Sequence, residues 1–258
     1  MNLLATQIGA LARRAMRKTL RQPFQLFPII FFPLVLLAVN ASGLKAATRL
    51  PGFPTHSYIS FAIAVAFIQG GMFSLINTGT NLAEDIESGF FNRLALTPLR
   101  RVSLISGLLV GVAALGVLQS AVYMLMGLVA GAHLDAGIGG ALVILVLGSL
   151  TAVAFGAFGC AAALRTGSGE AVQSLFPLFF VFIFLSSSSL PRNLLRTGWF
   201  HAVANVNPIS YLIEAFRSLY IYGWDATALW RGFAVVIGLT ILALLAIAGA
   251  LRTRLQRT

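Results

Sequence analysis

Residues 84–101 read EDIESGFFNRLALTPLRR and lie between two long apolar runs of the chain. The stretch carries six charged side chains, which are Glu84, Asp85, Glu87, Arg93, Arg100 and Arg101. Each of them would cost about 2.5 to 3.5 kcal/mol at the centre of a bilayer. The stretch therefore belongs at a membrane surface, and its acidic part predicts a short surface helix that Pro98 ends.

The composition indicates an all-α integral membrane protein. The 258 residues are 58% hydrophobic and only 10% charged, and the apolar runs have the length that a helix needs to cross the hydrocarbon layer. They are continuous rather than alternating, which argues against a membrane barrel. The expected spans are 24–44, 57–81, 103–130, 138–164, 171–190 and 228–251.

The distribution of basic residues predicts the orientation. With the amino terminus inside, 12 of the 18 Lys and Arg residues fall in cytoplasmic segments and 6 fall outside, which satisfies the positive-inside rule. Both termini are then cytoplasmic, and residues 84–101 form the main cytoplasmic loop.

Residues 1–23 form a predicted amphipathic helix on the cytoplasmic side. Its apolar stripe consists of Leu4, Ile8, Leu11 and Ala15, and its basic side carries Arg13, Arg14, Arg17 and Arg21. Such a helix either rests in the headgroup plane or serves only as a positive-inside anchor.

A second amphipathic helix is predicted in the last external segment, residues 191–227. Asn207 is a good N-cap and Pro208 suits the first helical position. The apolar residues that follow at helical spacing are Ile209, Leu212, Ile213, Phe216 and Tyr220. This helix lies on the outer leaflet or dips into it.

Catalytic and nucleotide-binding motifs are absent from the sequence. There is no G-x-S-x-G, no H-E-x-x-H and no G-x-x-x-x-G-K-[ST] phosphate loop, so another chain must bind ATP if ATP drives this protein. The scattered histidines do not suggest a metal site. The net charge of +11 is spread over connecting segments, and no nucleic-acid-binding motif accompanies it.

Polar and small residues within the spans leave two interpretations open. Asn77, Gln119, Gln173 and Ser174 either line a translocation path or bond helices together. Gly107-x-x-x-Gly111 allows close helix approach without indicating dimerisation by itself. Pro28, Pro33 and Pro177 should bend the first and fifth spans.

The charged stretch itself reads as a docking helix. Ile86, Phe90 and Leu94 recur at four-residue spacing, so one side can pack on the membrane domain. Asp85, Ser88 and Asn92 face away and are available to a partner. A solvated loop is the alternative interpretation.

At this point the chain resembles the permeases of type-2 ABC exporters, a group with daunorubicin-resistance-like drug exporters and polysaccharide exporters. The first signature comprises Glu84, Asp85, Glu87, Gly89, Arg93-Leu94 and Thr97-Pro98, and the second comprises Asn207-Pro208 with Arg217. We assign ATPase coupling to Glu84, Asp85, Glu87, Gly89, Asn92, Arg93, Thr97 and Pro98. The external signature is Asn207, Pro208, Glu214 and Arg217.

The resemblance implies a dimer, of identical or similar subunits, on two separate ATPase subunits in a bacterial plasma membrane. Residues 1–23 would be the interface helix, 24–258 the six-helix domain, 84–97 the coupling helix and 191–227 a re-entrant helical hairpin. ATP and Mg²⁺ would bind the partner, and this chain would bind no cofactor and catalyse nothing.

The nearly uncharged spans favour an amphiphilic or hydrophobic substrate, such as a drug, lipid or glycan-lipid, exported by alternating access. The rival interpretations are a secondary transporter or channel without an ATPase, which would need charges or broken helices inside the membrane, and a membrane enzyme.

Overall fold

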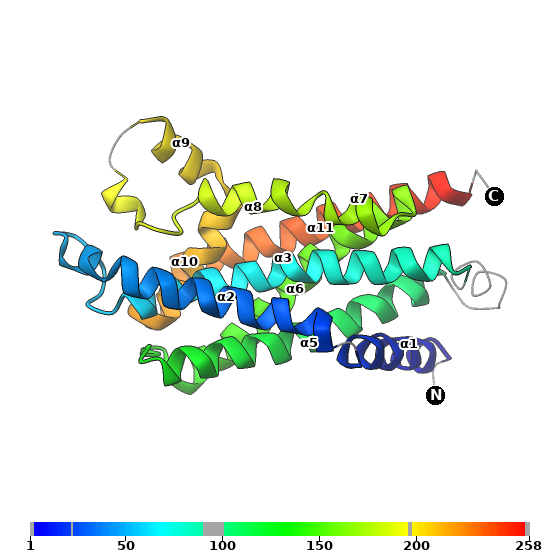
Figure 1. The fold of residues 1–258 in the computed structure, drawn as a ribbon, viewed down its shortest axis with the longest axis horizontal. Helices are drawn as coiled ribbons and strands as arrows, with labels where there is room; N and C mark the ends of the chain where they lie inside the picture. The colour runs from blue at the N-terminus through cyan, green and yellow to red at the C-terminus, as the bar shows by residue number, and fades with distance from the viewer. Residues whose placement is uncertain (1–2, 22, 90–100, 196–197, 256–258) are drawn as a thin grey trace.

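A computed structural model describes residues 3–21, 23–89, 101–195 and 198–255, and all regular structure in this part of the chain is helical (Figure 1). The α-helices are α1 (Leu3–Leu20), α2 (Pro23–Gly43), α3 (Tyr58–Glu87), α5 (Arg101–Val129), α6 (Gly137–Thr166), α7 (Gly169–Gln173), α8 (Phe176–Phe184), α9 (Trp199–Val206), α10 (Pro208–Ile221) and α11 (Ala226–Leu255). Two 3₁₀ turns, η1 (Lys45–Arg49) and η2 (Arg192–Leu194), follow α2 and α8.

Four of the six predicted spans are confirmed as helices long and apolar enough to cross a membrane: α3, α5, α6 and α11. The apolar helices 27–43 in α2 and 169–184 in α7 and α8 are shorter. The long helices run side by side (Figure 1). We call the end of the bundle that holds α1 and the carboxyl end of α11 the terminal end. The opposite end, which holds η1 and α9, is the loop end.

The fifth span, expected over 171–190 with a bend at Pro177, is interrupted between α7 and α8 and ends at Phe184 instead of reaching 190. The chain forms two helices, and α8 begins at Phe176 with Pro177 in its first turn, where the missing N–H of proline does no harm. The helix ends at Phe184 because serines follow: the hydroxyls of Ser186 and Ser188 both donate to the Ile183 carbonyl. Such side-chain bonds offer the backbone an alternative to helix.

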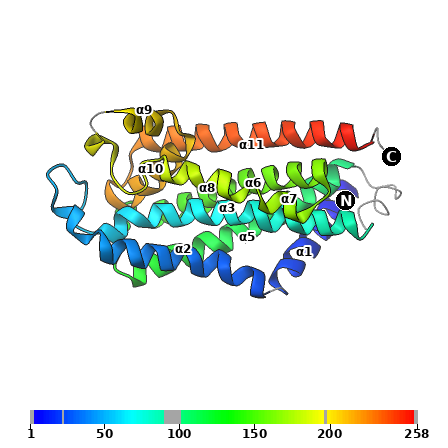
Figure 2. The ribbon, with the colours of Figure 1, turned by 45° about the horizontal axis from the view of Figure 1, so that its top comes forward.

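Helix α3 is the centre of the bundle (Figure 2). In the most apolar 18-residue stretch of α3, 72% of the residues are buried, whereas in that of α11 22% are buried. Glycines let α6 approach it closely, since a Cβ added at Gly159 would lie 2.1 Å from the Leu75 carbonyl oxygen. A movement of α3 therefore has to be accommodated by α6.

Helix α1 crosses the long helices at an angle and packs on α5 (Figure 2). A Cβ at Gly107 would lie 2.6 Å from Leu11 Cβ, and one at Gly111 would lie 3.0 Å from Ala15 Cβ. The described part of the apolar stripe of α1 thus packs on protein at these two positions. The Gly107-x-x-x-Gly111 pair serves a contact within the chain.

Replacing Gly111 by leucine should push α1 away from α5, because the added side chain has no room beside Ala12 and Ala15. We expect an apparent melting temperature several degrees lower, for a cost of about 1 to 3 kcal/mol. Thermal unfolding of the purified protein measures this. Gly238→Leu is the control, since nothing lies within 4 Å of a Cβ there; equal melting temperatures for the two variants would contradict the packing.

Candidate functional site

The acidic residues of the charged stretch form the last turns of α3. The helix runs through Glu87, and the turn after it passes through Gly89 with φ of +69°, a conformation that favours glycine. The acidic part of the helix expected over 84–97 is therefore the end of α3 rather than the start of a helix of its own, and the rest of that helix stays a prediction. Asn92, Arg93, Thr97 and Pro98 lie outside the described residues.

Basic side chains of α1 bind these acids. Arg14 donates from Nη1 to Asp85 Oδ2 at 2.9 Å and from Nη2 to Asp85 Oδ1 at 3.1 Å. Lys18 Nζ lies 3.0 Å from Glu84 Oε2 and 3.4 Å from Asp85 Oδ1, and it also donates to the Asn81 carbonyl at 3.2 Å. We call these four side chains the α1–α3 ion cluster.

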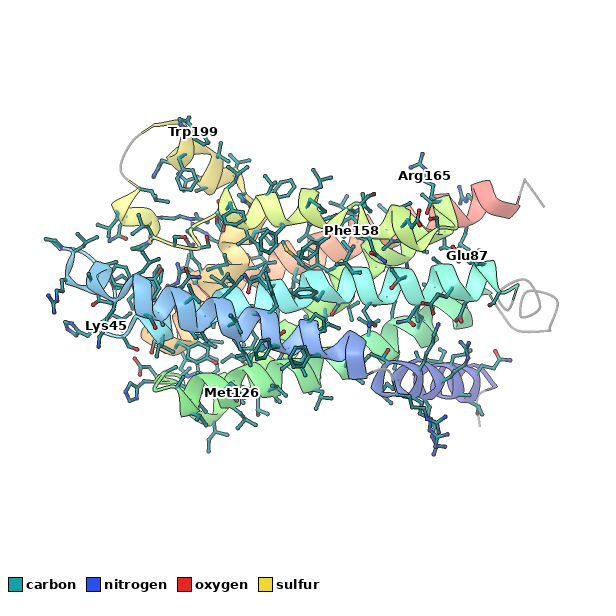
Figure 3. All side chains as sticks on the ribbon, in the orientation of Figure 1. Lys45, Glu87, Met126, Phe158, Arg165 and Trp199 are labelled. Carbon is teal, nitrogen blue, oxygen red and sulfur yellow. The ribbon has the colours of Figure 1, made fainter. Side chains whose placement is uncertain are left out.

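The cluster gains strength from its shape and partial burial. The Asp85 side chain is 19% exposed and that of Lys18 24% exposed, and the Arg14 contact is two-pronged, which is the favoured geometry of an arginine–carboxylate pair. An isolated ion pair at the surface adds at most about 1 kcal/mol to the free energy of unfolding, whereas a network of ion pairs with good geometry adds more. Glu87, by contrast, is exposed at the terminal end (Figure 3).

A cavity of about 90 Å³ lies directly beneath the cluster, among α1, α2, α3 and α5. Asn77 and Gln119 both line it, so the structure brings together two of the four polar residues predicted for a path. Gln173 and Ser174 do not line it and are exposed at the break between α7 and α8.

Gln119 also takes part in a bond between helices. Its Nε2 donates to the Tyr123 hydroxyl at 2.9 Å, and that hydroxyl donates to the Ile29 carbonyl of α2 at 2.5 Å. The Ile29 carbonyl lacks its usual helical donor because the residue four positions on is Pro33. The Tyr123 hydroxyl therefore satisfies a backbone carbonyl that Pro33 leaves without its helical donor.

At the loop end the prediction for Asn207 and Pro208 is confirmed. The Asn207 side chain accepts from the Ile209 N–H at 2.9 Å and caps α10, with Pro208 in the first turn. Its Nδ2 also donates to the Phe182 carbonyl of α8 at 2.6 Å. Helix α10 is largely buried, so it packs among the other helices rather than lying on their outside.

Arg217 of α10 is buried and binds the irregular backbone after α8. Its Nη2 donates to the carbonyls of Ser187 at 3.0 Å and Ser188 at 3.3 Å, and its Nε donates to the Phe61 carbonyl at 3.2 Å. The guanidinium carbon lies 3.5 Å from the centre of the Phe61 ring. Arg217 thus supplies donors to backbone carbonyls of the irregular segment after α8, which lack partners in a helix.

Glu214 lies one turn before Arg217 and pairs with a residue that the sequence did not single out. Its Oε1 is 2.6 Å from Arg192 Nε and accepts from the Ser187 hydroxyl at 3.4 Å. Arg192 also lies over the Tyr211 ring at 4.2 Å. The motif residues of α10 therefore fasten η2 and the end of α8.

Comparison with known proteins identifies the family. Residues 6–221 match the family described as ABC-2 type transporter. The chain belongs to this family. It is also 29% identical to the daunorubicin resistance ABC transporter permease protein DrrB1 of Streptomyces coeruleorubidus. This match extends over 212 residues and covers 80% of this chain and 72% of that protein. The resemblance to type-2 ABC permeases is confirmed, and this ABC-2 permease is a multi-pass membrane subunit.

A charge exchange tests the α1–α3 ion cluster of this ABC-2 permease. Arg14→Asp and Asp85→Arg each place like charges together and should lower the melting temperature by several degrees. The double variant restores the attraction and should recover most of that loss, with a coupling energy of about 0.5 to 3 kcal/mol. Thermal unfolding of the four proteins measures the coupling; additive losses would show that the two side chains do not interact.

Proposed function

We propose that this permease is the membrane subunit of an ATP-driven exporter whose separate ATPase subunits dock at the terminal end. The α1–α3 ion cluster is the observation that carries the proposal. It joins the acidic end of the central helix to α1, so a force applied there reaches α3 directly and α5 through the glycine contacts of α1.

The charges of the described residues support a cytoplasmic terminal end. Arg165 and Glu87 lie toward that end, whereas Lys45 lies toward the other (Figure 3). Helix α1 contributes three exposed or partly exposed basic residues besides Arg14, which are Arg13, Arg17 and Lys18, and Arg21 follows directly after the helix. By the positive-inside rule we infer that both termini face the cytoplasm, and the membrane in this proposal is a bacterial plasma membrane.

In this proposal α2 and the α7–α8 pair complete six spans, and α9 and α10 form the external hairpin. Two such subunits, identical or similar, make the membrane domain. ATP and Mg²⁺ bind the partner ATPase, whose nucleotide state favours one of two arrangements of the membrane domain because it contacts them differently.

The substrate in this proposal is amphiphilic or hydrophobic. Within the described part of α3, α5 and α6, charged side chains occur only near the terminal end. A charged substrate would therefore find no compensating charge along these helices. The relative named for daunorubicin resistance is consistent with a drug-like substrate, and so we favour drugs or lipids over hydrophilic glycans.

Glu87 offers a clean test of ATPase docking, because it is exposed and takes no part in the ion cluster. Glu87→Gln should weaken binding of the ATPase to the permease in nanodiscs about fivefold, which corresponds to the loss of one contact of about 1 kcal/mol. The melting temperature should not change.

Glu170→Gln is the matched control, since it removes another exposed acid outside the proposed docking segment. Unchanged affinity for the Glu87 variant, or an equal loss for the Glu170 variant, would contradict docking at the acidic end of α3.

A further inference from the structure

We propose that the cavity among α2, α3 and α8 binds an uncharged aromatic amphiphile and that Gln69 holds its polar group. The inference rests on the proposed function, because it names the class of substrate that the permease would carry. Binding can nevertheless be measured without an ATPase.

The cavity is large enough for a ring system. Its volume is about 240 Å³, whereas an engineered apolar protein cavity of about 150 Å³ already binds benzene. Phe32 of α2 and Phe184 of α8 line it and are 39% and 65% exposed. A ligand can therefore enter between these helices from the surrounding lipid.

Gln69 is the reason to expect a directed ligand. Its side chain lines the cavity and the residue is only 5% exposed. It has no hydrogen-bond partner among the residues that the structure describes. A buried amide left unpaired is unfavourable, and a ligand that both donates and accepts would satisfy it. Asn40, Tyr58, Ser188 and Ser189 line the same cavity and add polar groups beside Gln69.

The other residues that line the cavity determine which ring system and which charge the ligand can have. Phe180 packs near both other rings, 6.4 Å from the centre of Phe32 and 5.3 Å from that of Phe184, and such rings favour further offset or edge contacts with an aromatic partner. Among the described residues that line the cavity there is no Asp, Glu, Lys or Arg. A charged group there would lack compensation, so the ligand is neutral.

Two other cavities among the described residues lack this combination. The one among α6, α8, α10 and α11 is of similar size, about 230 Å³, but its lining is entirely apolar. The cavity beneath the ion cluster is smaller, about 90 Å³, and is lined by Arg14, Lys18 and Asp85. Sequence reasoning did not select Gln69, because the polar residues of the spans look alike until the fold shows which of them is unpaired.

A pair of matched probes tests the role of Gln69. The probes are 6-fluoro-2-naphthol, which is neutral and carries a hydroxyl, and 2-fluoronaphthalene, which lacks it. Their binding to the full-length permease in nanodiscs is followed by fluorine NMR, with empty nanodiscs correcting for partition into lipid. The wild type should prefer the naphthol by about tenfold, the worth of one good hydrogen bond.

Gln69→Leu should abolish this preference while keeping affinity for 2-fluoronaphthalene, because the apolar walls remain. Gln69→Met provides a second apolar variant of similar size. Thr151→Val is the control: Thr151 is buried in α6, bonds the Leu147 carbonyl and does not line this cavity. The absence of a preference in the wild type, as with a cavity that holds only water, or a preference unchanged in both Gln69 variants, would overturn the inference.

The result is separable from the proposed function. Failure of probe binding with normal docking of the ATPase would remove the ligand site alone. If the ATPase does not dock but the probes bind as expected, the proposed exporter mechanism is rejected and the ligand site is retained.

Discussion

The bundle depends on one constraint: a backbone carbonyl that loses its helical donor inside a membrane must find another, because no water replaces it. Two described departures from regular helix, at Pro33 and at the end of α8, show such donors. Pro33 frees the Ile29 carbonyl, and the Tyr123 hydroxyl takes it. At the end of α8, Asn207 binds the free Phe182 carbonyl, and Arg217 binds the carbonyls of Ser187 and Ser188 in the irregular segment that follows. These hydrogen bonds also hold α2, α8 and α10 in position.

A second set of contacts works at the terminal end. Glycines let α1 lie against α5 and let α6 lie against α3, while Arg14 and Lys18 join α1 to the acidic end of α3. Backbones in direct contact cannot slide without disturbing their neighbours. In the proposed mechanism, this rigidity is what allows a partner acting on one helix end to move several helices.

Much of the fold could be predicted from the sequence, because hydrophobic runs and helix caps are local signals. The spans at 57–81, 103–130, 138–164 and 228–251 correspond to α3, α5, α6 and α11, and the Asn207–Pro208 helix start was correct in detail. The fifth span was expected to reach residue 190, because an apolar run does not reveal the serine hydrogen bonds that end α8 at Phe184. The acids were expected on a separate helix because charge marks the membrane surface and not the end of a helix.

The partners within the candidate site could not be predicted. Arg14 and Asp85 are 71 residues apart, and Arg217 and Phe61 are 156 apart, so nothing in the local pattern links them. The same holds for Gln69, whose distinction is the lack of a described partner. The assignment of ATPase coupling to residues 84–98 stays a prediction, and residues 90–98 of that set lie outside the described part of the chain.

The most direct test of the account is the labelling of Glu87→Cys with a membrane-impermeant maleimide, in a Cys160→Ala background that removes the chain's one native thiol. The account predicts labelling in inside-out vesicles, protection when the ATPase is added, and no labelling in right-side-out vesicles. Labelling confined to right-side-out vesicles, or labelling that the bound ATPase does not reduce, would contradict the claim that this end of α3 is where the partner acts.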